Sequence, residues 1–283
     1  MRFGLEAYEM KSGKKKGVWF ALMVIAAIVL VVCVVAIGRE IYELQLQKQA
    51  DTKITLLARP SETPVPTATP EPTQEIVQIT PTPEPTASPV PQEIDFDALH
   101  QENEEIFAWI KVDGTRIDYP LLCRPDDDAY YHTHNVAHQK VTAGAIYIQG
   151  SVNSMELTDF HTVVYGHNMR NGSMFAGLHD FEEKDFFNAH DSVVIYTPER
   201  RLTYRIFAAY QRDDAHLMKK FQYDTVQNRQ AFLDDVYSHS GFFREDVQVT
   251  TDSRILTLST CVGGQDDQRY VVQAVLIADE PVQ

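Results

Sequence analysis

The chain has 283 residues, enough for one or two domains, and a formal net charge of −15 at pH 7. Residues 1–92 carry 9 acidic and 9 basic side chains, and residues 93–283 carry 31 and 16, so the negative charge belongs to the C-terminal part. This balance argues against nucleic acid as a partner, because phosphate neutralisation needs an excess of Lys and Arg. A solvated acidic surface accounts for the charge.

The N-terminal part contains one uncharged stretch, residues 17–37, which is 21 residues long. About 20 helical residues cross a membrane core, and the apolar region of a cleavable signal peptide is shorter, so we predict a transmembrane helix. Four lysines at positions 11–16 precede the stretch, whereas only Arg39 follows it closely. The positive-inside rule therefore predicts a single-pass cell-membrane protein with residues 1–16 in the cytoplasm and the C-terminal part outside.

Two connecting segments follow the apolar stretch. Residues 38–59 mix Ile41 and Leu44 with polar side chains and are predicted to form a short helical stalk. Residues 60–92 are predicted to be a linker, because ten of the 14 prolines fall there, interleaved with Thr and Glu. An extended polyproline II segment of this length would span on the order of 100 Å, so we expect a spacer.

The folded domain is predicted to cover residues 93–283. Asp95 is expected to cap a helix that continues to Trp109. Short strands follow, expected at Arg116–Tyr119, Gly144–Gln149, Thr162–Tyr165, Val193–Thr197, Leu202–Tyr210, Arg254–Leu258 and Tyr270–Ile277. Further helices are expected near Ser173–Leu178 and Val226–Ser240. Many short strands with few helices predict a mainly β fold, a closed or nearly closed barrel with peripheral helices.

A single cysteine stands at the end of the strand-like run Arg254-Ile255-Leu256-Thr257-Leu258-Ser259-Thr260-Cys261. The loop Val262–Asp267 is expected to follow, with Arg269 at the start of the next strand. Such an arrangement presents the thiol at a strand rim. A thiol becomes a strong nucleophile only as a thiolate, which requires an imidazole or a cationic setting.

A histidine occupies an equivalent position in Val163-Val164-Tyr165-Gly166-His167-Asn168-Met169, where Gly166 is expected to let the backbone turn. His132, His134 and His138 lie in a polar loop without the spacing of a zinc site, so no metal is predicted. Cys123 and Cys261 form no disulfide framework, and a bridge between them would silence the nucleophile. We expect Cys123 to lie half-buried under the site.

These motifs resemble the sortase family, with Thr-Leu-Ser-Thr-Cys, Tyr-Gly-His-Asn-Met and an Arg eight residues after the Cys. The flanking Asp118-Tyr119-Pro120 and Gly172-Ser173-Met174-Phe175 are similar to class B. The resemblance implies a cysteine transpeptidase without a cofactor that works through a thioacyl enzyme. In it Cys261 is the nucleophile, His167 the general acid and base, and Arg269 the donor to the oxyanion.

The resemblance also implies substrate contacts and partners. Ser259 and Thr260 would border the peptide groove, and Asp127, with Tyr130 in the same segment, takes the place where class B members often carry an Asn. Residues 213–240 correspond to the insert that shapes the recognition end. The partners would be secreted proteins with a C-terminal sorting signal, and the acceptor would be the amine of a peptidoglycan precursor or of a pilin.

Two other classes stay open on the sequence. One is a papain-like cell-wall hydrolase, although its Cys usually precedes its His, whereas here His167 comes 94 positions before Cys261. The other is a non-catalytic wall-spanning protein, for which a membrane anchor and a linker would also serve.

Overall fold

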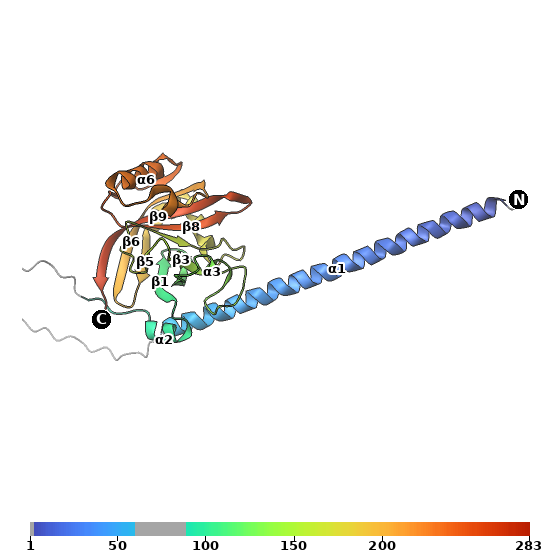
Figure 1. The fold of residues 1–283 in the computed structure, drawn as a ribbon, viewed down its shortest axis with the longest axis horizontal. Coiled ribbons are helices and arrows are strands. Elements are labelled where there is room, and N and C mark those ends of the chain that lie inside the picture. Colours follow the sequence, from blue (N-terminus) through green and yellow to red (C-terminus); the bar gives the residue numbers. More distant parts are fainter. Residues whose placement is uncertain (1–2, 60–88) are drawn as a thin grey trace, which may run out of the picture. The chain divides into compact units, whose positions relative to one another are not determined.

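The computed structural model of the chain describes residues 3–59 and 89–283 (Figure 1). It consists of two compact units, Met1–Lys48 and Gln49–Gln283. Most of the predicted linker, residues 60–88, lies outside the described residues.

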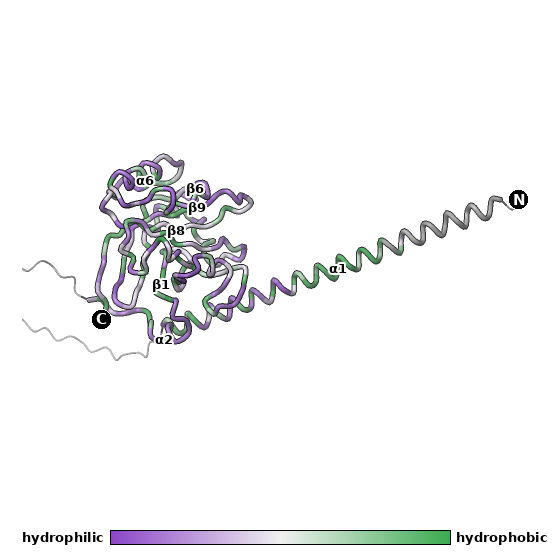
Figure 2. The backbone as a smooth tube through the Cα atoms, viewed as in Figure 1, coloured by the Kyte–Doolittle hydropathy of each residue, from purple (hydrophilic) through white to green (hydrophobic). Residues whose placement is uncertain are grey.

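One helix, α1 (Phe3–Ala58), contains both the predicted transmembrane stretch and the predicted stalk. Its part Leu22–Ala58 includes an 18-residue window of mean hydropathy 2.8, and Figure 2 shows an apolar run along it. Large apolar side chains stay exposed there, for example Leu30 at 65% and Val35 at 65%. Among the described residues α1 is the one helix long and apolar enough to cross a membrane, which makes it a candidate anchor.

The second unit begins inside this helix, not at residue 93. Ala50, Ile54 and Ala58 are buried in a hydrophobic cluster with Trp109 and Leu122. Arg59 Nη2 donates to Asp118 Oδ1 at 2.7 Å, and the Asp95 amide donates to the Ala58 carbonyl at 2.9 Å. The C-terminal turns of α1 are therefore part of the second unit's core.

The far end of the Pro-rich segment is attached to the same unit. Val90 pairs with Val282 in an isolated parallel bridge, and its amide donates to the Pro281 carbonyl at 2.9 Å. The segment thus leaves the second unit at Arg59 and re-enters it by Val90. The chain between the apolar stretch and the second unit is helical and does not include the prolines.

The second unit is built around a β-barrel. The sheet order is β5-β1-β2-β3-β4-β8-β9-β6-β7, and an additional β5–β6 pairing closes eight of the nine described strands, leaving β7 at the edge. The strands are β1 (Ile106–Val112), β2 (Asp118–Cys123), β3 (Ile146–Ile148), β4 (His161–Tyr165), β5 (Ser192–Tyr196), β6 (Arg200–Asp213), β7 (Gly241–Phe243), β8 (Ile255–Val262) and β9 (Gln265–Pro281). The predicted closed barrel is confirmed.

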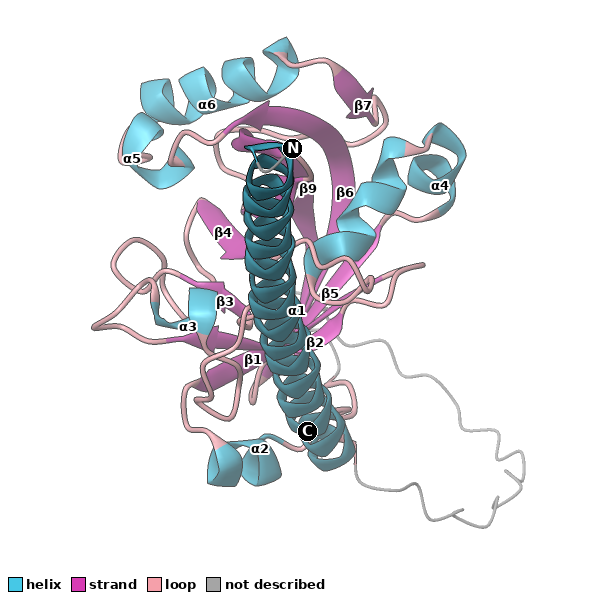
Figure 3. Cartoon of the chain, turned by 90° about the vertical axis from the view of Figure 1, so that its right-hand side faces the viewer, coloured by secondary structure: helices cyan, strands magenta, loops and turns pink. Residues whose placement is uncertain are grey.

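Short helices surround the barrel. They are α2 (Phe96–Glu102), α3 (Tyr130–Thr133), the 3-10 helix η1 (Phe175–Glu182), α4 (Lys184–Ala189), α5 (Leu217–Phe221) and α6 (Val226–Ser238). Figure 3 shows α5 and α6 beside β6 and β9, and a cluster that includes Leu217, Phe232, Tyr210 and Val271 fills the space between them. The predicted helices near residues 173–178 and 226–240 correspond to η1 and α6.

The helix predicted from Asp95 to Trp109 is wrong in its second half. Asp95 caps α2 as expected, since its Oδ1 accepts from the Ala98 amide at 2.9 Å. The helix stops because Asn103 is extended, with φ −156°, and its side-chain amide donates to the Val136 carbonyl at 2.8 Å. Ile106–Val112 then pairs with β2 and β5, so barrel closure overrides the local helical pattern.

Candidate active site

Cys261 lies near the end of β8 as a free, partly exposed thiol, which confirms the predicted strand-end position. Its cross-strand partner on β9 is Arg269. Directly paired residues of adjacent strands project from the same face of a sheet, so the thiol and the guanidinium share a face. The expected loop Val262–Asp267 is shorter than predicted, because Val262 pairs with Gln265 and leaves Gly263 and Gly264 as a two-residue turn.

His167 follows the end of β4, which runs parallel to β8. The Gly166 amide donates to the Ser259 carbonyl at 3.2 Å, and the Thr260 hydroxyl donates to the Gly166 carbonyl at 2.8 Å. Gly166 is required for close approach, since a Cβ there would lie 2.5 Å from Ile146 Cδ1 and 2.7 Å from Phe175 Cγ. These contacts bind the backbone before His167 to the strand that carries Cys261.

The imidazole of His167 is oriented by the α3 region. Its Nε2 lies 2.8 Å from the carbonyl oxygen of His132. A carbonyl only accepts hydrogen bonds, so Nε2 carries a proton and donates it. In the neutral ring this leaves Nδ1 unprotonated, so Nδ1 is the nitrogen that exchanges a proton during a reaction.

Arg269 is held by the turn before it. Its Nη1 donates to the backbone carbonyls of Asp266 and Gln268, both at 2.9 Å. Its Nη2 lies 3.9 Å from Asp214 Oδ2, a loose ion pair with the residue that follows β6. Nη1 is therefore occupied, whereas Nη2 and Nε remain to act on a ligand.

A cleft of about 210 Å³ brings these groups together. Cys261, His167 and Arg269 all line it, and so do Ser259 and Thr260. The Thr260 hydroxyl is already used by the Gly166 carbonyl, whereas Ser259 is a β8 residue on the same face as Cys261. The structure thus gathers five of the seven residues expected at the site.

Asp127 and Tyr130 are not among the residues that line this cleft. The Asp127 Oδ1 accepts from the Ala129 amide at 3.1 Å, so the carboxylate stabilises the turn before α3. The Tyr130 ring stacks on His134 at 4.1 Å, and the Arg124 guanidinium lies over it at 3.6 Å. Both side chains are engaged in local contacts of the α3 segment.

His132 is a site residue that the sequence reasoning missed, since it was considered only as a possible metal ligand. Its ring centroid lies 4.3 Å from that of His167, and it lines the cleft. Burial lowers the pKa of His132, and the nearby His167 and Arg269 lower it further, which favours a neutral ring. Only the contact of α3 with the segment that follows β4 reveals this neighbour.

Cys123 is buried more deeply than expected. It is 1% exposed in the main core and does not line the cleft, whereas a half-buried position under the site was predicted. Burial first, and then the charges of Asp128 and Glu105, raise the pKa of Cys123 to about 11. Its thiol is therefore inert compared with a thiol at a strand rim.

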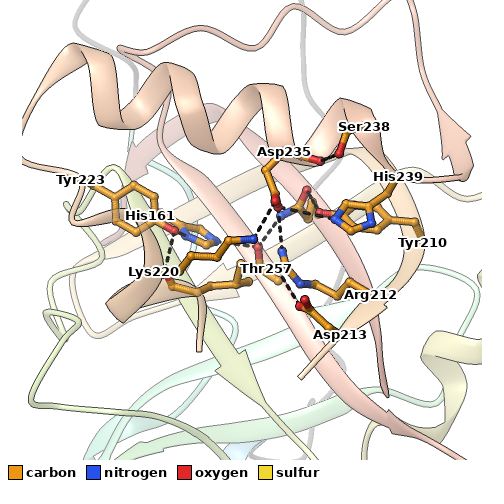
Figure 4. A network of polar contacts seen from close by, with 12 residues as sticks. His161, Tyr210, Arg212, Asp213, Lys220, Tyr223, Asp235, Ser238, His239 and Thr257 are labelled. Carbon is orange, nitrogen blue, oxygen red and sulfur yellow. Dashed lines mark hydrogen bonds and ion pairs between the residues drawn. The ribbon is translucent and has the colours of Figure 1, made fainter. Parts of the chain in front are cut away.

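The far wall of the cleft is formed by residues from Arg212 to Leu217, at the start of the insert. A polar network supports this wall (Figure 4). Arg212 Nη1 and Lys220 Nζ contact the two oxygens of Asp235, at 3.3 and 2.8 Å. Burial opposes ionisation of Asp235, but Lys220 and Arg212 outweigh it and lower its pKa. The network thus attaches α5 and α6 to the end of β6.

The described residues contain no group of three or more His, Cys, Asp and Glu side chains that could hold a metal ion. The cleft brings together a thiol, an imidazole and a guanidinium from three neighbouring backbone segments.

Comparison with known proteins agrees with this geometry. A Sortase domain model matches residues 110–277. Sortase B of Listeria monocytogenes is 33% identical over 181 residues, which cover 63% of this chain and 72% of that protein. The X-ray structure of Clostridium perfringens sortase B has a TM-score of 0.60 at 34% identity and covers 65% of this chain and 100% of that one.

A Staphylococcus aureus sortase B–substrate complex has a TM-score of 0.57 at 27% identity, covering 64% of this chain and 84% of that one. The family match spans more than half of the chain and includes both strands of the site. The chain therefore belongs to the sortase family, in its class B branch, whose members are cysteine transpeptidases.

Proposed function

We propose that this chain is a membrane-anchored transpeptidase that cleaves the sorting signal of secreted proteins and joins them to an amine of the cell wall. The observation that carries the proposal is the cleft in which Cys261, His167 and Arg269 meet. The cross-strand pairing of Cys261 with Arg269 supports a nucleophile beside an oxyanion donor.

In the first half-reaction, the Cys261 thiolate attacks a backbone carbonyl carbon of the sorting signal, and a C–S bond forms. The negative charge moves to the carbonyl oxygen, where Arg269 donates from the nitrogens that the Asp266 and Gln268 carbonyls leave unoccupied. His167 takes the proton of the Cys261 thiol at Nδ1 as the thiolate forms. It then gives this proton to the departing amine, the C–N bond breaks, and a thioester remains.

In the second half-reaction, the incoming amine attacks the thioester carbonyl carbon. Neutral His167 takes the proton that this amine loses, the C–S bond breaks, and the thiolate of Cys261 leaves with its electron pair. The product is an amide, and Cys261 and His167 return to their starting charges. No cofactor is needed at either step.

The Staphylococcus aureus sortase B–substrate complex supports the binding of a substrate by this chain. The apolar helix α1 supports a single-pass anchor. The four lysines at positions 11–16 favour a cytoplasmic N-terminus and a catalytic unit outside. The second unit begins within this helix, so the tether is short. A short tether keeps the thioester near lipid-linked wall precursors, which raises the effective concentration of the amine.

The test uses the full-length chain in detergent micelles with fluorogenic LPxTG- and NPxTN-type peptides and Cys261→Ala as the control. We expect the wild type to cleave one peptide class and mass spectrometry to detect a thioester adduct on Cys261. Adding a peptidoglycan-like amine should give a ligated product whose share rises with amine concentration. A lysine-containing pilin-like peptide is run in parallel as the competing acceptor.

Two outcomes would refute the proposal. Free acid as the product at every concentration of both amines would indicate a peptidase. Cleavage by the Cys261→Ala variant at the wild-type rate would remove the thiol from the reaction.

A further inference from the structure

Behind the cleft, side chains gather on the carbonyl oxygen of Cys261. Asn168 Nδ2 lies 3.1 Å from this oxygen, and His179 Nε2 lies 3.1 Å from the same atom. Asn168 Nδ2 and His179 Nε2 are 3.0 Å apart, and His179 Nδ1 lies 2.6 Å from Glu182 Oε1. Neither Asn168, His179 nor Glu182 lines the cleft. Asn168 and His179 contact the main chain of the nucleophile, and Glu182 contacts His179.

Asn168 connects the segment that carries His167 with the strand that carries Cys261. Its backbone continues from His167, while its side chain donates to Cys261. The loop is further fixed by the Phe175 amide, which donates to the His167 carbonyl at 2.9 Å, and by the bridge between Asn168 and Met174. The accepting carbonyl lies where the β8–β9 register shifts, between Cys261 and Val262. Side chains thus hold the backbone of Cys261 at the point where the pairing of β8 with β9 becomes irregular.

The hydrogen-bond directions follow from the donor inventory. The ionised Glu182 carboxylate only accepts, so the His179 Nδ1 carries the proton that it receives. In neutral His179 the Nε2 is then an acceptor and takes one hydrogen of the Asn168 amide. The Cys261 carbonyl oxygen shares this hydrogen in a three-centre bond, because Asn168 Nδ2, His179 Nε2 and this oxygen lie 3.0, 3.1 and 3.1 Å from one another. Glu182 therefore selects the His179 tautomer that orients Asn168.

The ring of His179 is itself held in place. It stacks on Tyr270, with centroids 5.2 Å apart and an angle of 26° between the rings. Tyr270 is 4% exposed and is the cross-strand partner of Thr260. The relay thus rests on the same two strands that carry Cys261 and Arg269.

We propose that Asn168, His179 and Glu182 form a positioning relay that fixes the main chain of Cys261 relative to His167. The proposal rests on the function proposed above, because that function makes Cys261 and His167 the reacting groups. The three residues do not touch the substrate. They act by keeping the thiol and the imidazole in reacting geometry, where a displacement of about 1 Å costs about 10²-fold in rate.

The first test is Asn168→Asp in the full-length chain. The variant keeps the size of the side chain but removes both amide hydrogens. We expect kcat to fall by about 10- to 100-fold while KM stays within about twofold, because the substrate groove is untouched. The matched control is Asn171→Asp. The Asn171 Oδ1 accepts from the Ser173 amide at 3.0 Å, a role that a carboxylate retains, so its kcat should stay within about twofold of wild type.

The second test addresses Glu182, whose side chain is half exposed, so its loss leaves the fold intact. Glu182→Ala should lower kcat by about three- to tenfold, and Glu182→Gln, which still accepts from His179 Nδ1, should restore most of it. The control is Asp113→Ala, which breaks the similar pair of Asp113 Oδ2 and His190 Nδ1, 2.8 Å apart and remote from Cys261. This control should leave kcat unchanged.

A double variant shows whether the residues act as one unit. Combining Asn168→Asp with Glu182→Ala should give about the same kcat as Asn168→Asp alone, because the relay is already broken. Wild-type kcat in the Asn168→Asp enzyme, or full additivity of the two changes, would overturn the relay. Absence of a thioester adduct in the wild type would instead refute the proposed function, so the two failures are distinguishable.

Discussion

The groups around Arg269 hold its guanidinium in place, but no carboxylate of the described residues lies in close contact with its positive charge. Its nearest polar contacts are two backbone carbonyls, and its carboxylate partner Asp214 is 3.9 Å away and half exposed. Its cross-strand neighbour on β6 is another arginine, Arg212, which is bound to Asp235. This leaves the Arg269 guanidinium as a preorganised positive group beside the thiol.

Replacing Arg269 by Ala should lower kcat by at least about 10²-fold, the scale of losing one oxyanion donor. Arg269→Lys should recover little, because one ammonium cannot hold both backbone carbonyls and still donate from a second nitrogen. Steady-state cleavage of the sorting peptide measures both. Arg205→Ala is the control, since Arg205 pairs with Asp191 and Asp246 and does not line the cleft. A near-normal rate for Arg269→Ala would remove this residue from the mechanism.

His161 is the most deeply buried histidine of the described residues, at 1% exposed, and lies in the network beneath α5 and α6 (Figure 4). Its ring nitrogens are 2.7 Å from the Tyr223 hydroxyl and 2.7 Å from the Thr257 hydroxyl. Burial, and then the charge of Arg212, lower the pKa of His161 to about 3. The folded chain therefore keeps this ring neutral.

This neutrality predicts a pH-dependent stability. Below its ordinary pKa of 6.5 the His161 ring is protonated in the unfolded chain but stays neutral in the folded one. The folded state therefore keeps its full stability above pH 6.5 and loses stability as the pH falls below this value. Lowering the pH from 6.5 to about 5 should lower the free energy of unfolding by about 2 kcal/mol through His161. Urea unfolding at several pH values measures it. His161→Gln should show a shallower dependence, and parallel curves for the two proteins would contradict the assignment.

At the scale of elements, α1 has two roles in one continuous helix. Its apolar stretch is exposed, while its last turns pack onto the barrel through Ala50, Ile54 and Ala58. Lys53 pairs with Glu102 of α2, and Arg59 pairs with Asp118 of β2. The helix end therefore completes a core that the barrel alone leaves open.

Ile54→Ala should lower the free energy of unfolding by about 2–4 kcal/mol, because it leaves a cavity next to Trp109. The control in the same helix is Leu56→Ala, where the side chain is 72% exposed and the change should stay below about 0.5 kcal/mol. Unfolding is followed by Trp109 fluorescence in a Trp19→Phe background. Equal effects of the two substitutions would show that the end of α1 does not belong to the folded unit.

At the scale of the whole molecule, the proposed topology exposes the Pro-rich segment outside the cell. Protease added to intact protoplasts should therefore yield a C-terminal fragment that starts within residues 60–92. Denaturing electrophoresis and N-terminal sequencing identify it. Because residues 50–58 pack on the barrel, the fragment should stay on the membrane until this contact dissociates. Protection of the C-terminal unit in intact protoplasts, with cleavage only after lysis, would contradict the orientation.

The sequence by itself determined the chemistry, the fold class and the candidate anchor. Thr-Leu-Ser-Thr-Cys261 and Tyr-Gly-His167 are strand ends followed by turn residues, and strand ends, caps and apolar runs are encoded by neighbouring residues. The same local coding explains why the Asp95 cap and the strand that carries Cys261 were predicted correctly.

Tertiary structure alone decided how these parts meet. Ile106–Val112 became a strand because β2 and β5 lie on either side of it. His132 contacts His167, 35 positions away, and Asn168 donates to Cys261, 93 positions away. Ile54 is buried by elements that come much later in the chain. Such contacts depend on barrel closure and on desolvation, which no local pattern encodes, so the nucleophile could be named from the sequence while its supports could not.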